Sequence, residues 1–166
     1  NETCAAISMV YLFERMFLLH GESKYIDCME RTLYNGVISG MSMDGGRFFY
    51  PNPLSSDGKY AFNADGNTTR QPWFGCACCP SNLCRFIPSV PGYLYGVKDN
   101  NIYVNLFAGN TSTIKVNGKD VVLEETTEYP WNGDIAIKVD DNKAGQFGMK
   151  IRIPGWVKGQ PVPSDL

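Results

Sequence analysis

The chain has 166 residues, a formal net charge of −2 and 43% hydrophobic residues. A chain of this length buries about 70% of its unfolded surface, so it can build a core without disulfides. Its lysines and arginines are scattered, which argues against nucleic acid or an anionic membrane surface as a ligand. No run approaches the ~20 apolar residues of a transmembrane helix, and no signal-peptide pattern opens the sequence. These properties predict a globular protein without nucleic-acid or membrane partners, and they leave compartment and oligomeric state open.

Both ends of the sequence resemble interior segments of a longer protein. The first residues run directly into an apolar helical pattern, and the segment 161–166 trails away after a predicted strand. We therefore expect the chain to be a fragment.

The first structural elements predicted are two helices. Residues 4–19 are apolar nearly all round, which is typical of a helix buried on most sides. Gly21 is suited to the left-handed residue that ends a helix, and Ser23 to the cap of a second helix over about 24–39. The short turn predicts an antiparallel hairpin. Because the first helix is apolar on nearly every side, this hairpin needs more helices around it than the chain supplies.

The helical pattern is lost from Gly40 to Cys79, apart from a short predicted strand over 47–50. A segment of about forty residues exceeds ordinary loop lengths, and such loops are commonly functional or disordered. Its many aromatic residues argue against disorder. Aromatic residues make up 13% of the whole chain, and they suit either loop packing or stacking on sugar rings.

Strands dominate the sequence after a third, short helix. That helix should start at Pro80 and kink or end near Ile87, because Pro88 and Pro91 interrupt it. Alternating patterns then predict strands over 102–106, 113–117, 120–124, 135–139 and 149–153, with a hairpin turn at 117–118. The fold class expected is α+β, with an antiparallel sheet of about five strands belonging to a sandwich. The composition shift places the domain boundary near 96–100.

Three of the six cysteines lie within the stretch Cys76-Ala77-Cys78-Cys79-Pro80. Proline is favoured at the first position of a helix, so Cys79 or its neighbour should cap a helix that begins at Pro80. The helix dipole would then favour thiolate over thiol by roughly 0.3–1 kcal/mol. The stretch therefore offers a reactive or metal-binding group of sulfurs.

Three interpretations of the cysteines stay open from residue type and spacing. The first is buried free thiols, which suits Cys28 and Cys84 because both fall within helical patterns. The second is disulfides, for which the CxxC of Cys76 and Cys79 is weak support. The third is a metal site. Zinc takes thiolate and carboxylate ligands, and the candidates are Glu2, Cys4, Cys78 and Cys79.

Other catalytic patterns are poorly supported. His20 is the only histidine and would have to be the base of a Cys–His hydrolase. Its position before Gly21 is typical of a residue that complements the helix dipole. The acidic pairs at 124–125 and 140–141 resemble solvated strand and turn positions rather than the paired carboxylates of most glycosidases.

Five motifs, in this order, together resemble a known family: Glu2-Thr3-Cys4, Met29–Gly36, Arg47–Leu54, Cys76–Asn82 and Tyr103–Leu106. The chain is similar to the β-L-arabinofuranosidases of glycoside hydrolase family 127 and their relatives. The resemblance covers roughly residues 1–110 strongly, and the remainder agrees only in its strand-rich type.

The resemblance implies a retaining exo-glycosidase whose (α/α)₆ barrel is followed by β-sandwich domains. Residues 1–96 would be the C-terminal part of the catalytic barrel, and residues 97–166 a truncated β-sandwich portion. The substrate implied is a glycan or glycoside with terminal β-L-arabinofuranose or a similar sugar. An alternative of another class is a non-catalytic structural or carbohydrate-binding module whose cysteines are buried or hold a structural zinc.

The resemblance also implies roles for individual residues. Cys78 matches the nucleophile, Glu2, Cys4, Cys78 and Cys79 match the zinc ligands, and Tyr50 matches a substrate contact. Cys76 is left as a packing residue. The family's general acid/base is a glutamate upstream of Asn1, so the isolated chain should be inactive.

Overall fold

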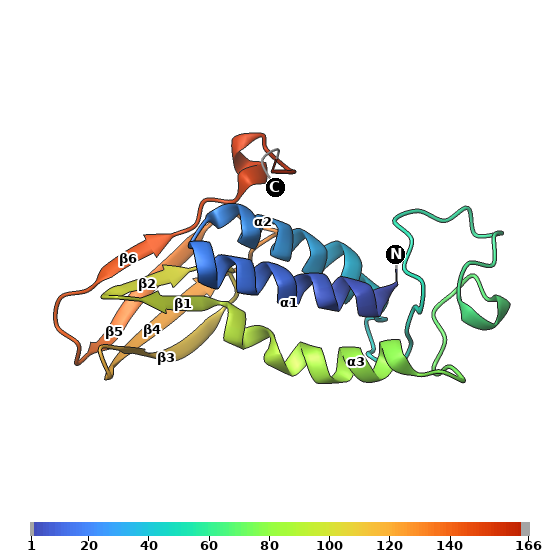
Figure 1. Cartoon of the computed structure of the whole chain (residues 1–166), viewed down its shortest axis with the longest axis horizontal. Helices are drawn as coiled ribbons and strands as arrows, with labels where there is room; N and C mark the ends of the chain where they lie inside the picture. Colours follow the sequence, from blue (N-terminus) through green and yellow to red (C-terminus); the bar gives the residue numbers. More distant parts are fainter. Residues whose placement is uncertain (1, 164–166) are drawn as a thin grey trace. The chain divides into compact units, whose positions relative to one another are not determined.

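A computed structural model describes residues 2–163, apart from the side chain of Asp65. The chain divides into two compact units, Asn1–Val90 with Gly155–Leu166 and Pro91–Pro154. Helices α1 to α3 and a long loop belong to the first unit, and strands β1 to β6 belong to the second (Figure 1). The predicted trailing segment 161–166 is described only as far as Pro163.

The first unit begins with the predicted helical hairpin. Helix α1 covers Thr3–His20 and ends at Gly21, which has φ +72° and donates its N–H to the Phe17 carbonyl. Helix α2 covers Ser23–Thr32 and continues as a π-helical turn, η1, over Leu33–Val37 and a 3-10 turn, η2, over Ile38–Gly40. Glu22, rather than Ser23, occupies the cap position of α2, and no side chain caps it. The helical segment therefore ends at Gly40, close to the predicted end at about residue 39, but its last turns are π-helical and 3-10 instead of α-helical.

The burial of α1 differs from the expectation. Its buried residues are few, and its larger exposed side chains are between 41% and 71% accessible. The exposed set is Met9, Leu12, Leu18 and Leu19. The prediction of a helix buried on most sides is thus wrong for the described chain, in which α2, η1 and α3 pack on α1 and leave these side chains uncovered. By length and composition alone α1 could also span a membrane, a property that it shares with ordinary core helices.

A long loop connects η2 to α3, as expected from the sequence. It holds one short 3-10 turn, η3, over Ala64–Gly66, and the predicted strand is reduced to isolated bridges that pair Phe48 with Met41 and with Gln71. Helix α3 covers Cys78–Phe86 and passes into a 3-10 segment, η4, over Ile87–Tyr93. The predicted end near Ile87 is confirmed. A 3-10 turn, η5, over Gly155–Lys158 completes the unit.

The second unit contains two three-stranded sheets instead of the single antiparallel sheet expected. One sheet has the order β1 (Tyr95–Lys98), β2 (Asn101–Val104), β6 (Gly148–Ile151). The other has the order β3 (Asn110–Val116), β4 (Lys119–Thr127), β5 (Ile135–Asn142). Strands β2 and β6 run parallel, which is possible because a long connection separates them.

A shared core joins these sheets. The buried set draws on β2, β3 and β4 and consists of Ile102, Ile114, Val116, Val121 and Leu123. The predicted hairpin turn between β3 and β4 is confirmed, since both of its residues, Asn117 and Gly118, have positive φ. In β4, alternate residues Val121, Leu123 and Glu125 are buried. The strand period therefore places a carboxyl on the core face.

Candidate metal and thiol site

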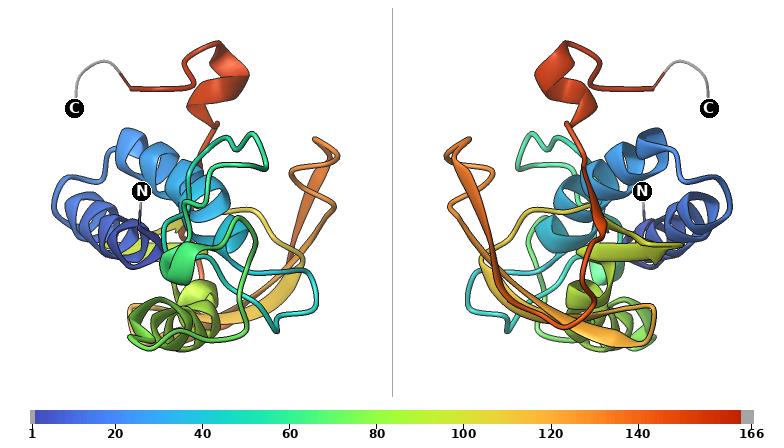
Figure 2. Two further views of the ribbon diagram at one scale, coloured as in Figure 1. Left: turned by 90° about the vertical axis from the view of Figure 1, so that its right-hand side faces the viewer. Right: turned by 90° about the vertical axis from the view of Figure 1, so that its left-hand side faces the viewer.

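The candidate site lies where two helices of the first unit begin. Helices α1 and α3 run side by side with their first turns at the same end, next to the long loop (Figures 1 and 2). Tyr11 and Phe86 pack between them, with ring centroids 5.6 Å apart. Because both helices start at this end, residues 74 positions apart in sequence, Cys4 and Cys78, come together.

Helix α3 starts two residues earlier than predicted. Cys78 and Cys79 are its first two residues, and Ala77, rather than Cys79, is the cap. Pro80 is the third helical residue, where its missing N–H is still one of the four that have no partner within a helix. The cysteines therefore lie in the first helical turn, where two successive side chains point about 100° apart.

Glu2, Cys4, Cys78 and Cys79 form a compact set of ligand atoms. Each offers one sulfur or carboxylate oxygen, and these atoms all lie within 4.8 Å of one another. The Glu2 Oε1 atom is 3.8 Å from the sulfur of Cys78 and 3.8 Å from that of Cys79, and the two sulfurs are 4.0 Å apart. The residues thus converge from two helix starts.

The donor set fits zinc. With bonds of about 2.0–2.3 Å to oxygen and sulfur, ligands around one tetrahedral zinc lie about 3.5–3.8 Å apart. The distances among Glu2, Cys78 and Cys79 need no more than a few tenths of an ångström of contraction to reach that spacing, and atoms at the 4.8 Å limit of the cluster need about 1 Å. Three sulfurs and one carboxylate oxygen are also the donors that zinc accepts in four-coordinate sites.

Tyr50 reaches the same cluster from the long loop. Its hydroxyl lies 3.0 Å from the Cys78 sulfur, and its carbonyl oxygen lies 3.7 Å from the Cys79 sulfur. The Tyr50 ring packs edge to face on Phe74, at 5.7 Å between centroids. The loop therefore supplies the cluster with a hydroxyl whose ring is held in place.

The two adjacent thiols have opposite electrostatic environments. The hydrogen bond with Tyr50 lowers the pKa of Cys78, and the same bond raises the pKa of the Tyr50 phenol. Burial raises the pKa of Cys79, and burial also raises that of Cys4. A thiolate at Cys78 is thus stabilised by a donated hydrogen bond, whereas burial disfavours ionisation of the other two and a nearby cation would favour it.

The state and burial of the cysteines test two of the interpretations made from the sequence, disulfides and buried free thiols. All six cysteines are free, so no disulfide forms. Cys28 is buried, as expected of a packing thiol. Cys84 and Cys76 are exposed, so the expectation that they serve as packing residues is wrong. Cys84 lies within α3, and Cys76 precedes the helix, where its hydrogen bond with Cys78 helps to lower the pKa of the Cys78 thiol.

His20 is remote from the cluster. It is the last residue of α1, and its ring lies 5.6 Å from that of Tyr25. At 1.5 Å of rise per residue, the 16 positions from Cys4 to His20 span about 24 Å. The histidine therefore cannot act as the base for Cys78 within this fold.

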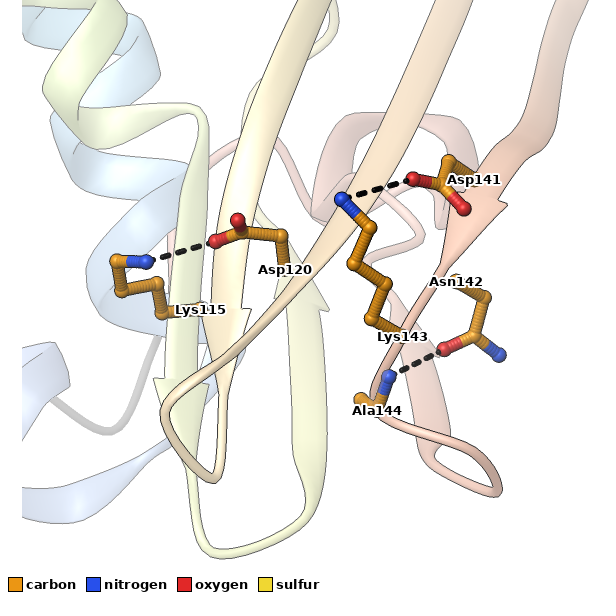
Figure 3. Close-up of polar contacts among 6 residues, drawn as sticks. All are labelled: Lys115, Asp120, Asp141, Asn142, Lys143 and Ala144. Atoms are coloured by element: carbon orange, nitrogen blue, oxygen red, sulfur yellow. Dashed lines mark hydrogen bonds and ion pairs between the residues drawn. The ribbon is translucent and has the colours of Figure 1, made fainter.

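The acidic pairs in the second unit form no paired-carboxylate site among the described residues. Asp120 forms an ion pair with Lys115 at 2.7 Å, and Asp141 forms one with Lys143 at 3.5 Å. Figure 3 draws both pairs. The Asp140–Asp141 pair is solvated, as expected. The Glu124–Glu125 pair is not, because Glu125 is only 2% exposed and accepts hydrogen bonds from the Tyr95 hydroxyl and the Ala108 amide.

Comparison with known proteins decides the family. Residues 1–92 match the family model described as the catalytic domain of GH127 β-L-arabinofuranosidase, and residues 101–163 match that of its middle domain. The chain belongs to glycoside hydrolase family 127. This confirms the resemblance carried by the five sequence motifs.

Individual family 127 proteins are also similar to this chain in sequence and structure. It is 33% identical to a non-reducing end β-L-arabinofuranosidase of Bifidobacterium longum subsp. longum, a match that covers 96% of this chain and 25% of the relative. A solved family 127 β-arabinofuranosidase is 59% identical, with a TM-score of 0.90 over 99% of this chain and 25% of that one. A family 127 β-L-arabinofuranosidase from Geobacillus stearothermophilus T6 is 43% identical, with a TM-score of 0.83 over 93% and 25%. The chain spans about a quarter of the length of these relatives.

Two residues that sequence reasoning missed hold the site together. Thr3, fully buried, donates its hydroxyl to the Phe49 carbonyl and its amide to the Tyr50 carbonyl. Asn63, 4% exposed, accepts a hydrogen bond from the Tyr50 amide. Asparagine is common in loops as a turn former, so only the fold shows that this one is buried.

Proposed function

We propose that this chain belongs to a retaining β-L-arabinofuranosidase that releases terminal β-L-arabinofuranose, or a similar sugar, from a glycan or glycoside. Residues 1–96 are the C-terminal part of its (α/α)₆ catalytic barrel, and residues 97–166 are part of a β-sandwich. The observation that carries the proposal is the convergence of Glu2, Cys4, Cys78 and Cys79 with the Tyr50 hydroxyl at one thiol. The names of the relatives supply the sugar.

Cys78 is the nucleophile in this proposal. Its thiolate attacks the anomeric carbon, so that a carbon–sulfur bond forms and the glycosidic carbon–oxygen bond breaks. The departing oxygen takes a proton from a general acid, a glutamate that we expect upstream of Asn1. Water then attacks the same carbon and gives its proton to that glutamate, which releases the sugar and restores the thiolate. Two displacements at one carbon retain its configuration.

Glu2, Cys4, Cys78 and Cys79 would hold zinc. Bound there, the ion keeps thiols deprotonated near neutral pH. Tyr50 contacts the substrate in the same pocket and donates its hydroxyl to the Cys78 sulfur when that sulfur is ionised. Cys79 and Cys4 serve as ligands only, since burial raises the pKa of both thiols, whereas the hydrogen bond with Tyr50 lowers the pKa of Cys78.

Selective capture of the nucleophile tests this function. A full-length protein carrying these residues is incubated with L-arabinofuranose that bears a bromoacetamide at the anomeric position, and labelled peptides are identified by mass spectrometry. We expect Cys78 to be labelled, and Cys78→Ser to abolish the labelling and lower kcat/KM by at least about 10³-fold. Cys84→Ser, which changes an exposed cysteine on the same helix, is the matched control. Equal labelling of all six cysteines would instead support a non-catalytic module.

A further inference from the structure

The segment that carries Tyr50 is held from two sides, by Thr3 and by Asn63. On one side, Thr3 donates its amide to the Tyr50 carbonyl at 3.0 Å and its hydroxyl to the Phe49 carbonyl at 2.9 Å. On the other side, the Asn63 Oδ1 atom accepts the Tyr50 amide at 2.9 Å. The amide and the carbonyl of Tyr50 are therefore both fixed.

Asn63 also forms hydrogen bonds that connect separate segments of the long loop. Its Oδ1 atom accepts from the Ala64 amide at 3.0 Å, and its Nδ2 group donates to the Thr69 carbonyl at 2.9 Å. Its own amide donates to the Asn67 carbonyl at 2.8 Å. The bond from Ala64 caps the short 3-10 turn η3, and the other two join loop segments outside helices and strands. One buried side chain thus replaces the ladder that a strand would provide.

The consequence for the site follows from the reach of Tyr50. The Tyr50 hydroxyl oxygen is six bonds from its Cα, so a small rotation of the backbone displaces it by more than the tolerance of a 3.0 Å contact. Phe74 restrains the ring from one edge only. The hydrogen bond from the Tyr50 amide to Asn63 is therefore needed to hold the direction in which the Tyr50 side chain leaves the backbone.

We propose that Asn63 is a positioning residue that acts through Tyr50: by accepting the Tyr50 amide it holds the Tyr50 hydroxyl against the Cys78 sulfur. The catalytic consequence rests on the function proposed above, whereas the placement of the ring does not. Among the described residues, the hydrogen bonds of Asn63 run to the long loop and none reaches the ligand set, so its effect on the thiols should pass through Tyr50.

A double-variant cycle in a full-length protein tests the catalytic consequence. We expect Asn63→Ala to lower kcat about tenfold, the effect of one lost hydrogen bond of ordinary strength, with a smaller change in KM. We expect Tyr50→Phe to lower kcat similarly, and the combined variant to fall no further, because the hydroxyl is already absent. Multiplicative losses in the combined variant, or an unchanged kcat in Asn63→Ala, would overturn the proposal.

Two further variants separate positioning from general stability. Asn63→Asp keeps the oxygen that accepts the Tyr50 amide and loses the donor to Thr69, so it should lower Tm but keep kcat within about twofold of the wild type. Asn52→Ala is the matched control. Asn52 is another buried asparagine of the loop, and it donates to the Gly36 carbonyl and the Ser39 hydroxyl. We expect it to lower Tm without changing kcat.

Fluorine NMR provides a readout that needs no activity. With 3-fluorotyrosine incorporated, the Tyr50 signal is assigned by its absence in Tyr50→Phe. We expect this signal to shift or broaden in Asn63→Ala and to stay at its wild-type position in Asn63→Asp and Asn52→Ala. An unchanged signal in Asn63→Ala contradicts the positioning role. A shifted signal in a protein without hydrolytic activity supports the positioning and rejects only the proposed function.

Discussion

At the scale of single residues, Cys78 and Cys79 show how neighbours of the same type acquire different chemistry. Successive residues of a helix point about 100° apart, so Cys79 faces the interior, with no exposed surface, while Cys78 faces Tyr50. Burial raises the pKa of the one, and a hydrogen bond lowers the pKa of the other. The difference comes from orientation and not from residue type.

Substitution of Cys79 should therefore cost more stability than substitution of an exposed cysteine. We expect Cys79→Ser to lower the free energy of unfolding by about 1–3 kcal/mol, because it places a hydroxyl at a fully buried position. Cys84→Ser should change it by no more than about 0.5 kcal/mol, because Cys84 is exposed. Urea unfolding in the presence of a chelator measures both values. Equal losses would contradict the assigned burial.

The buried carboxyl of Glu125 predicts how the free energy of unfolding depends on pH. Burial raises its pKa above the usual range, against the hydrogen bonds from Tyr95 and the Ala108 amide. A carboxyl whose pKa is higher in the folded than in the unfolded chain stabilises the fold below the unfolded pKa, about 4.3. That stabilisation is lost as the pH rises through the folded pKa, by about 1.4 kcal/mol for each unit of difference.

We accordingly expect the free energy of unfolding of the wild type to fall more steeply than that of Glu125→Gln as the pH rises from about 4, over the range in which the folded carboxyl ionises. Urea unfolding at several pH values measures the difference. Glu124→Gln, which changes the exposed neighbour on the same strand, should leave the wild-type slope unchanged. Parallel curves for wild type and Glu125→Gln would show that the carboxyl titrates alike in both states.

At the scale of elements, the hairpin of α1 and α2 depends on one close approach. A Cβ atom added at Gly36, in the π-helical turn η1, would lie 2.9 Å from the Cβ atom of Ala6 on α1. Such a distance is too short for two carbon atoms, so the helices would have to separate. The glycine therefore allows η1 to pack on α1.

The substitution Gly36→Ala should lower the free energy of unfolding by about 1–3 kcal/mol, the usual cost of overpacking. Gly133→Ala is the control, because a Cβ atom there meets nothing within 4 Å and its φ is not positive. Thermal unfolding followed by circular dichroism compares the two. A stabilised Gly36→Ala variant would mean that η1 can shift away from α1 without loss of packing.

At the scale of the whole molecule, the ligand set joins distant parts of the chain. Glu2 and Cys4 begin the first unit, and Cys78 and Cys79 lie 74 or more positions later. A metal held by all four would close this long loop, and its binding free energy would add to stability because the unfolded chain has no preformed site.

We expect zinc to raise Tm and a chelator to lower it. At a zinc concentration 1,000 times the Kd, binding contributes about 4 kcal/mol. Glu2→Ala should remove most of the zinc-dependent shift in differential scanning calorimetry. Glu22→Ala, which changes a carboxylate at the cap of α2 instead, should keep it. An identical zinc response in both variants would exclude Glu2 as a ligand.

Local sequence patterns determined the elements that depend on near neighbours. Gly21 ends α1, Pro88 and Pro91 end α3, and Asn117-Gly118 turns the β3–β4 hairpin, because each requirement concerns backbone angles within a few residues. The order of five motifs was likewise sufficient to identify family 127.

Only the tertiary structure decided which residues meet. Tyr50 lies against Cys78, Asn63 supports Tyr50, β6 pairs in parallel with β2, and Glu125 faces a core. Each relation joins residues at least 13 positions apart, and its free energy depends on packing and burial that no local pattern encodes. The sequence by itself determined the chemical groups of the site, and the fold determined their distances and environments.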